Sequence, residues 1–177
     1  NSYEFRNNLK NYYNLDSTVI LNPLKIVKTK KKISFFKNFN RLKIICIGRL
    51  TYQKDHMTLL KSLELLKYKF KANFRLYLIG KGYNFNLLSN FIKNSGLQKN
   101  IKLAGYKENA FEYINSSDLL VLTSRYEGLP NVLIEAQALG VPIISSDCPS
   151  GPKEILMNGK LGELFKVGDY KRLSKKF

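Results

Sequence analysis

Two acidic residues, Glu127 and Glu135, are spaced eight positions apart in the segment SRYEGLPNVLIEAQALGVPII, residues 124–144. Pro130 suits the first turn of a helix, and the glycine and proline near the end of the segment stop one, so we predict a helix over residues 130–139. Glu127 then lies in the loop before the helix, and Glu135 lies more than one turn inside it. The two carboxylates therefore flank the start of a helix.

The start of this helix is a predicted anion-binding site, because the backbone N–H groups of Asn131, Val132 and Leu133 would have no partners within the helix. A carboxylate beside a bound phosphate is repelled by it and instead accepts hydrogen bonds from hydroxyl groups. Sugars and riboses carry hydroxyls next to phosphates, so Glu127 and Glu135 are candidate hydroxyl-binding residues. The alternative that Glu127 simply lies in a turn and Glu135 on a solvated helix face stays open. A glycosidase-like acid/base pair is poorly placed, since those carboxylates flank one bond across a cleft.

A second candidate group lies in GRLTYQKD, residues 48–55, after a predicted strand. This loop is neither the GxGxxG of a dinucleotide fold nor the GxxxxGK of a phosphate-cradling loop. Arg49 and Lys54 combine a planar fork with a mobile point charge and so suit the two phosphates of a diphosphate, although basic loops also serve solvation. In the next such loop, Gly80 and Gly82 allow a sharp turn or a close approach to a ligand.

Short apolar runs alternate with helical patterns along the chain. The runs are residues 42–48, 74–80, 101–106, 118–124 and 141–146, and the helical patterns are residues 55–70, 84–96, 107–117, 130–139 and 151–159. Strands separated by single helices are joined by right-handed crossovers, so we predict an α/β fold with a doubly wound, Rossmann-like parallel sheet. Ligands of such sheets bind at the carboxyl ends of the strands, here the loops after Gly48, Gly80, Gly105, Thr123 and Ser146.

The helical pattern over residues 55–70 has a predicted cap and a predicted core face. Asp55 suits the capping position, and the face consists of Leu59, Leu60, Leu63, Leu66 and Phe70. The single histidine, His56, follows the cap, where we expect a surface or capping role and not catalysis.

Residues 1–40 differ from the rest and are predicted to be a lead-in and connector. Residues 3–15 suit a helix, residues 19–26 a short strand that ends in an Asn-Pro turn, and residues 28–40 a basic connector. Residues 41–177 form the predicted domain. Because the chain starts without Met and ends inside a helical pattern, we expect it to be part of a longer protein.

The composition indicates an anionic partner. Lys and Arg number 30 against 13 acidic residues, a net charge of +17 in 177 residues, which favours a nucleic acid, a membrane surface or a phosphorylated ligand unless the lysines only solvate the surface. Cys46 and Cys148 lie far apart, and with one histidine they offer no soft metal site. We expect a reducing, cytoplasmic setting, and no apolar run is long enough to cross a bilayer.

The segments GRLTYQKD, LAGYKEN and above all SRYEGLPNVLIEAQALGVPIISSD carry a family resemblance. They resemble the donor-binding domain of retaining GT-B glycosyltransferases of glycosyltransferase family four, whose hallmark is E-x7-E. The resemblance covers about residue 19 to the end of the chain. It implies that residues 1–40 connect from an N-terminal acceptor domain outside this chain, and that residues 41–177 are a nucleotide-sugar-binding domain truncated at its C-terminus.

The resemblance also implies roles for the candidate charged residues. Arg49 and Lys54 would bind the diphosphate of a nucleotide-sugar and stabilise it as a leaving group, together with the dipole of the helix. Glu127 would bind hydroxyls of the donor sugar, and Glu135 would bind the ribose hydroxyls. The N–H groups of residues 131–133 would meet the phosphates.

Further donor contacts are implied for residues that carry no charge. Tyr106 would contact the base through its backbone, and Gly48 and Gly80 would line the same pocket. Family members of this kind need no divalent metal, and the chain has no D-x-D pair, so no metal site and no cofactor are expected. The implied reaction transfers the sugar with retention, with attack on the leaving-group face and a phosphate oxygen as the proton acceptor.

One segment departs from the family pattern. The loop SSDCPSGPKEIL, residues 145–156, stands where many members carry a Gly-Gly pair, so the family's glycine backbone contacts do not transfer directly to Ser150 and Gly151. It resembles enzymes that add galactose, N-acetylgalactosamine or glucose to lipid-linked or lipopolysaccharide glycans. We therefore expect a UDP-sugar donor that carries N-acetylgalactosamine or galactose. The expected acceptor is a glycan or lipid-linked molecule bound by the domain outside this chain. The expected location is peripheral, at the anionic inner face of the cytoplasmic membrane.

Two other functions stay open on the sequence. A nucleotide-sugar epimerase of related fold would need its own acid/base residues at the sugar, and none is displayed. A non-enzymatic module that binds nucleic acid would interleave aromatic and basic residues on one surface, whereas the aromatics here fall largely in core patterns, so we expect no nucleic-acid partner. As an enzyme, the isolated chain is expected to bind the donor but to be poorly active.

Overall fold

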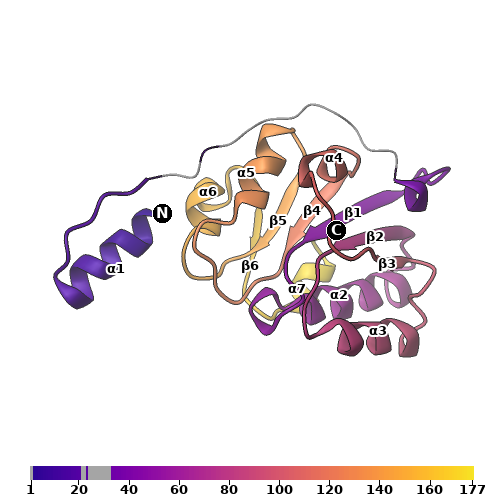
Figure 1. The fold of residues 1–177 in the computed structure, drawn as a ribbon. Coiled ribbons are helices and arrows are strands. Elements are labelled where there is room, and N and C mark those ends of the chain that lie inside the picture. The colour runs from indigo at the N-terminus through magenta and orange to yellow at the C-terminus, as the bar shows by residue number, and fades with distance from the viewer. Residues whose placement is uncertain (1, 21–22, 24–32) are drawn as a thin grey trace.

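The computed structural model describes residues 2–20, 23 and 33–177. Its centre is a six-stranded sheet in the order β3-β2-β1-β4-β5-β6 (Figure 1). Every pair of neighbouring strands is parallel. The strands are β1 Leu42–Ile47, β2 Phe74–Ile79, β3 Ile101–Leu103, β4 Leu119–Leu122, β5 Ile143–Ser146 and β6 Glu163–Phe165. The predicted doubly wound, Rossmann-like α/β sheet is confirmed.

Helices cover both faces of this sheet (Figure 1). One layer consists of α2 His56–Tyr68, α3 Phe85–Asn94 and α7 Tyr170–Ser174; the other consists of α4 Ala110–Ile114, α5 Asn131–Ala138 and α6 Pro152–Ile155. Ile44 and Cys46 of β1 join the core on the α2 side, while Ile45 between them joins the core on the α5 side. This alternation follows from the two-residue period of a strand.

Helix α2 shows how the local sequence sets an element. Asp55 caps its start, as predicted, with its Oδ1 accepting the N–H of Thr58 at 3.4 Å and its Oδ2 accepting the Thr58 hydroxyl at 2.9 Å. The four leucines of the predicted face are buried, but the prediction for Phe70 is wrong. The helix ends at Tyr68, so Phe70 leaves the helical period and is 44% exposed.

The strand β6 was not expected from the sequence. It has three residues and only Phe165 is buried, so neither length nor alternation marks it as a strand. It pairs with β5 at the edge of the sheet, and the Asp147 N–H donates to the Phe165 carbonyl at 2.7 Å. Tertiary pairing and not local pattern therefore defines this element.

The N-terminal part lies beside the sheet domain. Helix α1, Tyr3–Tyr13, is confirmed and touches the loop that precedes α6 and α6 itself (Figure 1): Glu154 accepts the Tyr3 N–H and Glu4 accepts the Ser150 N–H, both at 3.0 Å. Most of the strand expected over residues 19–26 lies outside the described residues. In the described end of the connector, the short 3-10 helix Ser34–Phe36 packs on β2. Within the described residues, no helix is long and apolar enough to cross a membrane.

Candidate functional site

The sheet order places the site between β1 and β4. Strand β1 pairs with β2 on one side and with β4 on the other, so the loops after β1 and β4 leave the sheet in opposite directions and open a crevice at its carboxyl edge. The two loops are also bonded to each other. The Arg125 N–H donates to the Gln53 carbonyl at 2.8 Å, and the Thr123 hydroxyl donates to the Lys54 and Asp55 carbonyls at 3.0 Å.

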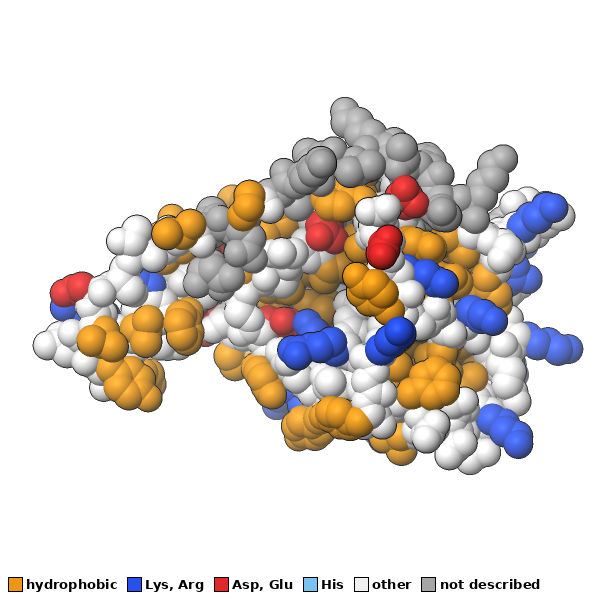
Figure 2. Space-filling model, viewed as in Figure 1, with side chains coloured by type: hydrophobic (Ala, Val, Ile, Leu, Met, Phe, Trp, Pro, Cys, Tyr) orange, Lys and Arg blue, Asp and Glu red, His pale blue; other side chains and the backbone are white. Residues whose placement is uncertain are grey.

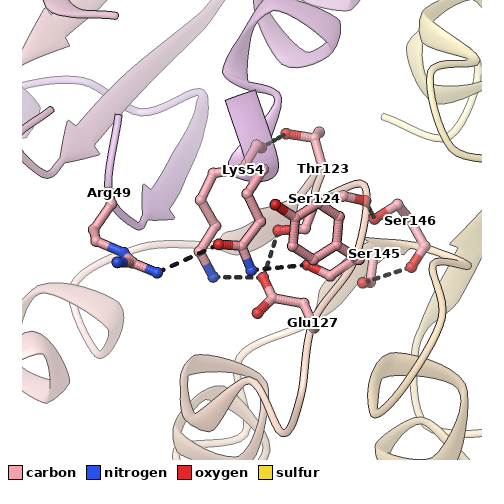
Figure 3. Close-up of polar contacts among 9 residues, drawn as sticks. Arg49, Lys54, Thr123, Ser124, Glu127, Ser145 and Ser146 are labelled. Carbon is pink, nitrogen blue, oxygen red and sulfur yellow. Dashed lines mark hydrogen bonds and ion pairs between the residues drawn. The ribbon is translucent and has the colours of Figure 1, made fainter. Parts of the chain in front are cut away.

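Two predicted site residues meet in this crevice (Figure 3). The ammonium of Lys54 lies 2.5 Å from Oε1 of Glu127, and the side chains are only 15% and 6% exposed. The hydroxyl of Ser124 donates to the same oxygen, also at 2.5 Å. A carboxylate this buried is stabilised by its paired cation and its hydrogen bond. The site thus holds one cation and one anion at its centre.

Gly48 leaves room for the Lys54 side chain. A Cβ at Gly48 would lie 3.3 Å from two carbons of the Lys54 stem, so a larger residue would crowd the lysine. The side chain of Lys54 therefore runs over bare backbone on its way to Glu127.

Arg49 lies at the exposed side of the same loop and does not contact Glu127 directly (Figure 3). Its Nη2 donates to Oε1 of Gln53 at 3.3 Å, and Nε2 of Gln53 donates to the Tyr126 carbonyl at 3.0 Å. Arg49 and Lys54 are thus in one loop, as predicted, with Gln53 connecting Arg49 to the loop of Glu127. The sequence analysis did not single out Gln53, although its position between the two basic residues was a signal.

Gly80 is required by the packing of two backbones. A Cβ at Gly80 would lie 1.9 Å from the Gly48 carbonyl oxygen, an impossible contact. The Gly80 N–H donates to the Gly105 carbonyl at 2.9 Å, and the Gly48 N–H donates to the Ile79 carbonyl at 3.0 Å. These bonds extend the sheet ladder into the loops. Tyr106 follows Gly105 at the same edge and is 63% exposed.

The start of α5 differs from its prediction in two ways. Pro130 is the N-cap and Asn131 the first helical residue, one position later than expected. The N–H of Leu133 is not free, because it donates to the Pro130 carbonyl at 3.0 Å, and its side chain is fully buried. The prediction of three open N–H groups is therefore wrong at Leu133, which packs in the core, while Asn131 and Val132 form the first turn. The N-cap residue, Pro130, makes no side-chain hydrogen bond to this turn.

Glu135 lies in the second turn of α5 and is half-buried. Burial raises the pKa of its carboxyl above the ordinary value of 4.5. Glu135 is therefore only partly solvated, and its surroundings differ from those of Glu127.

An ion pair that sequence reasoning missed closes the other side of the β1 loop. Arg125 Nη2 lies 3.0 Å from Asp55 Oδ2, and the guanidinium carbon lies 4.3 Å from the Tyr52 ring centroid. Asp55 therefore caps α2 and anchors Arg125 at once. Because 70 positions separate the two residues, their spacing gave no signal.

The prediction of a surface position for the histidine is wrong. His56 is the first residue of α2 but is buried, with only 2% of its surface exposed. Burial, with a smaller contribution from the charge of Lys54, lowers its pKa to about 4. The imidazole is therefore neutral at neutral pH.

The loop after β5 packs against the loop that contains Glu127. The Glu127 N–H donates to the Pro149 carbonyl at 3.1 Å. Gly151 has a φ of +98°, and a Cβ there would lie 2.3 Å from the Gly128 carbonyl oxygen. Its neighbour Ser150 has a φ of +64° and gives its N–H to Glu4. In this chain, Gly151 serves packing between two loops.

The two cysteine thiols of the chain are buried. Burial raises the pKa of Cys46 to about 12 and that of Cys148 to about 11, and both are free cysteines. No cluster of three or more His, Cys, Asp or Glu side chains suited to a metal ion occurs in the described part of the chain.

The fold and the site define an α/β protein with a cation, two carboxylates and a helix start at the switch point of a parallel sheet. The family model for glycosyl transferases group 1 matches residues 27–177. The chain belongs to this family, and the resemblance seen in its E-x7-E segment is confirmed.

Three curated relatives are similar over most of the chain. An uncharacterized glycosyltransferase of Methanocaldococcus jannaschii is 42% identical over 63% of this chain and 27% of its own length. The lipopolysaccharide 1,6-galactosyltransferase of Escherichia coli is 31% identical over 71% and 35%. An N-acetylgalactosaminyltransferase of Campylobacter jejuni, named for a diphospho-undecaprenol-linked acceptor, is 29% identical over 70% and 33%. The chain thus spans about a third of these relatives.

A solved structure agrees with the fold. A variant of Staphylococcus aureus TarM in complex with fondaparinux, α-GlcNAc-glycerol and UDP superposes with a TM-score of 0.86. The alignment covers 99% of this chain and 34% of TarM at 23% identity, which establishes the shared fold.

Proposed function

We propose that this chain is the donor-binding domain of a retaining, metal-independent glycosyltransferase, with an acceptor-binding domain outside the chain. The observation that carries the proposal is the convergence of Lys54, Glu127 and the start of α5 at the carboxyl edge between β1 and β4. This arrangement offers positive charge and a hydroxyl-binding carboxylate within one crevice.

The diphosphate of the donor binds Lys54, Arg49 and the first turn of α5. Arg49 lies at the exposed rim of the crevice, where its planar guanidinium can bind two phosphate oxygens. Lys54 supplies a mobile positive charge from the buried side of the crevice. The partial positive charge of the helix start adds to both. The three groups neutralise the negative charge that develops on the leaving diphosphate.

The two carboxylates bind hydroxyls. Glu127 binds the donor sugar, because it lies beside Lys54 and hence beside the phosphate next to the sugar. Glu135 lies in the second turn of α5, beyond the helix start that binds the diphosphate, and it binds the ribose. The Tyr106 backbone contacts the base, at the edge formed by Gly48 and Gly80.

The reaction retains the anomeric configuration. The acceptor hydroxyl attacks the face from which the diphosphate leaves, its oxygen forms the new bond to the anomeric carbon, and a phosphate oxygen of the leaving group takes the proton. Glu127 is held by Lys54 and Ser124, which suits binding and not proton transfer.

The donor is a UDP-sugar, with galactose or N-acetylgalactosamine as the sugar, and the acceptor is a lipid-linked or lipopolysaccharide glycan. Support comes from the names of the E. coli and C. jejuni relatives and from the UDP complex of TarM.

The protein works at the cytoplasmic face of an anionic membrane. A net charge of +17 favours such a surface, and on the face drawn in Figure 2 the blue Lys and Arg side chains spread over the sheet domain, where red acidic side chains are few.

Calorimetry with UDP, GDP and single-stranded DNA at moderate salt tests the proposal. We expect UDP to bind and DNA to bind weakly or not at all. Tight binding of DNA with no binding of either nucleotide would overturn it in favour of a nucleic-acid module.

A further inference from the structure

The Glu127 carboxylate is held by two donors that meet one oxygen. Lys54 Nζ and Ser124 Oγ each lie 2.5 Å from Oε1 (Figure 3). Among the described residues, no hydrogen bond to the second oxygen, Oε2, is found. Oε2 is therefore the atom that an incoming hydroxyl can reach.

The two donors differ in how firmly they are fixed. Lys54 carries its ammonium on four methylenes and is 15% exposed, so it can swing toward another anion. Ser124 has a single side-chain torsion and is fully buried. Its carbonyl also accepts the Ser146 hydroxyl at 2.6 Å, which ties its backbone to β5.

A bound diphosphate competes for one of these donors. Two phosphates carry more negative charge than one carboxylate, so they draw the Lys54 ammonium away from Glu127. Glu127 would then lose the partner that compensates its burial, and only the Ser124 hydroxyl can remain on Oε1.

We propose that Ser124 is the positioning residue that keeps Glu127 aimed at the donor sugar after Lys54 has turned to the diphosphate. This inference rests on the proposed function. Ser124 acts through Glu127 and does not touch the donor, so its effect depends on the sugar and not on the nucleotide.

The variant Ser124→Ala tests this role. Without the hydroxyl, the free carboxylate rotates once Lys54 leaves it, and we expect affinity for a UDP-sugar to fall about 10-fold while affinity for UDP changes less than about 2-fold. Ser124→Cys keeps the volume with a much weaker donor and is expected to behave like Ser124→Ala.

Ser145→Ala is the matched control. Ser145 is also fully buried, and its hydroxyl donates to the Ser146 carbonyl at 3.1 Å and does not contact Glu127. Its loss is expected to lower the melting temperature like that of Ser124 but to leave the ratio of the two affinities unchanged. The measurements are calorimetric dissociation constants for UDP and for UDP-glucose, UDP-galactose and their two N-acetylated counterparts, with thermal melting of each variant.

Each outcome decides something. A lower UDP-sugar affinity in both Ser124 variants, with the control unchanged, supports the inference. If the wild-type chain binds UDP and Glu127→Ala alters the ratio but Ser124→Ala does not, Ser124 has no positioning role and the proposed function stands. If Glu127→Ala leaves the ratio unchanged, the inference fails with the sugar role of Glu127. If the wild-type chain binds no UDP, the proposed function fails too.

Discussion

At the residue scale, the two carboxylates of the E-x7-E segment have different surroundings, so their substitution should affect ligand binding differently. Glu127 is almost fully buried against a lysine and a serine, whereas Glu135 is half-buried on a helix and its pKa is raised by burial. The first is held in a fixed position for a ligand. Under the proposed function, the ribose hydroxyls would compensate the desolvation of the second carboxylate.

We expect Glu135→Ala to weaken UDP binding about 10-fold, since the ribose is present in UDP and in UDP-sugars alike. Glu127→Ala should mainly remove the preference for the intact UDP-sugar. Calorimetric titration of both ligands measures this, and Glu64→Ala in α2 controls for the loss of one negative charge. Equal losses for both ligands at Glu127 would contradict its sugar role.

The single histidine gives a pH prediction. His56 has a folded pKa of about 4 against an ordinary 6.5, so between these values the unfolded chain binds a proton that the folded chain does not. Stability contributed by neutral His56 is therefore complete above about pH 6.5 and is lost as the pH falls toward 4.

Proton NMR measures this directly, because the single histidine in the chain gives one set of imidazole signals. We expect its titration midpoint near pH 4 in the folded protein and near 6.5 in urea. A folded midpoint near 6.5 would show that His56 is exposed, in conflict with its burial in this structure.

At the element scale, the loops after β1, β4 and β5 pack backbone on backbone, and glycine permits this. A Cβ at Gly151 would lie 2.3 Å from the Gly128 carbonyl oxygen and 2.8 Å from Pro130 Cδ. Those atoms belong to the turn between Glu127 and α5. The geometry of the candidate site thus depends on the absence of a side chain in a neighbouring loop.

Gly151→Ala should therefore destabilise the chain by about 2–4 kcal/mol, the sum of a positive-φ strain and a steric overlap. Gly140→Ala is the control, since Gly140 also has a positive φ, +68°, but has no atom within 4 Å of a Cβ. It should cost about 1 kcal/mol. Urea denaturation gives both values, and equal costs would mean that the loops yield to the new methyl group.

The difference between local sequence patterns and contacts between distant residues explains how much of this structure the sequence predicts. Five strands and the helices between them follow from local periods, because buried parallel strands are short apolar runs. The pairing of Lys54 with Glu127 joins residues 73 positions apart, and that of Asp55 with Arg125 joins residues 70 apart, so both depend on strand order. The prediction of an open N–H at Leu133 is wrong because the third residue of a helix can donate its N–H to the carbonyl of the N-cap residue.

At the scale of the whole molecule, the excess of basic residues predicts a salt-dependent affinity for anionic surfaces. We expect the chain to sediment with vesicles that contain phosphatidylglycerol at about 50 mM salt and to be released at about 500 mM salt. At the higher concentration the electrostatic screening length falls to a few ångströms. Vesicles of phosphatidylcholine alone are the control. Binding that is equal for both lipids, or that resists salt, would contradict an electrostatic contact.

The chain spans about a third of its curated relatives, so binding and turnover should separate. Under the proposed function, the chain supplies the diphosphate and sugar contacts, but a fast reaction also requires an acceptor hydroxyl held about 3 Å from the anomeric carbon. We therefore expect the purified chain to bind UDP while transferring little or no sugar from UDP-galactose or UDP-N-acetylgalactosamine to a lipid-linked acceptor. Calorimetry on the same sample shows that the site is intact. Robust multiple turnover would mean that this chain orients the acceptor by itself, and the acceptor residues would then have to be sought among residues 1–177.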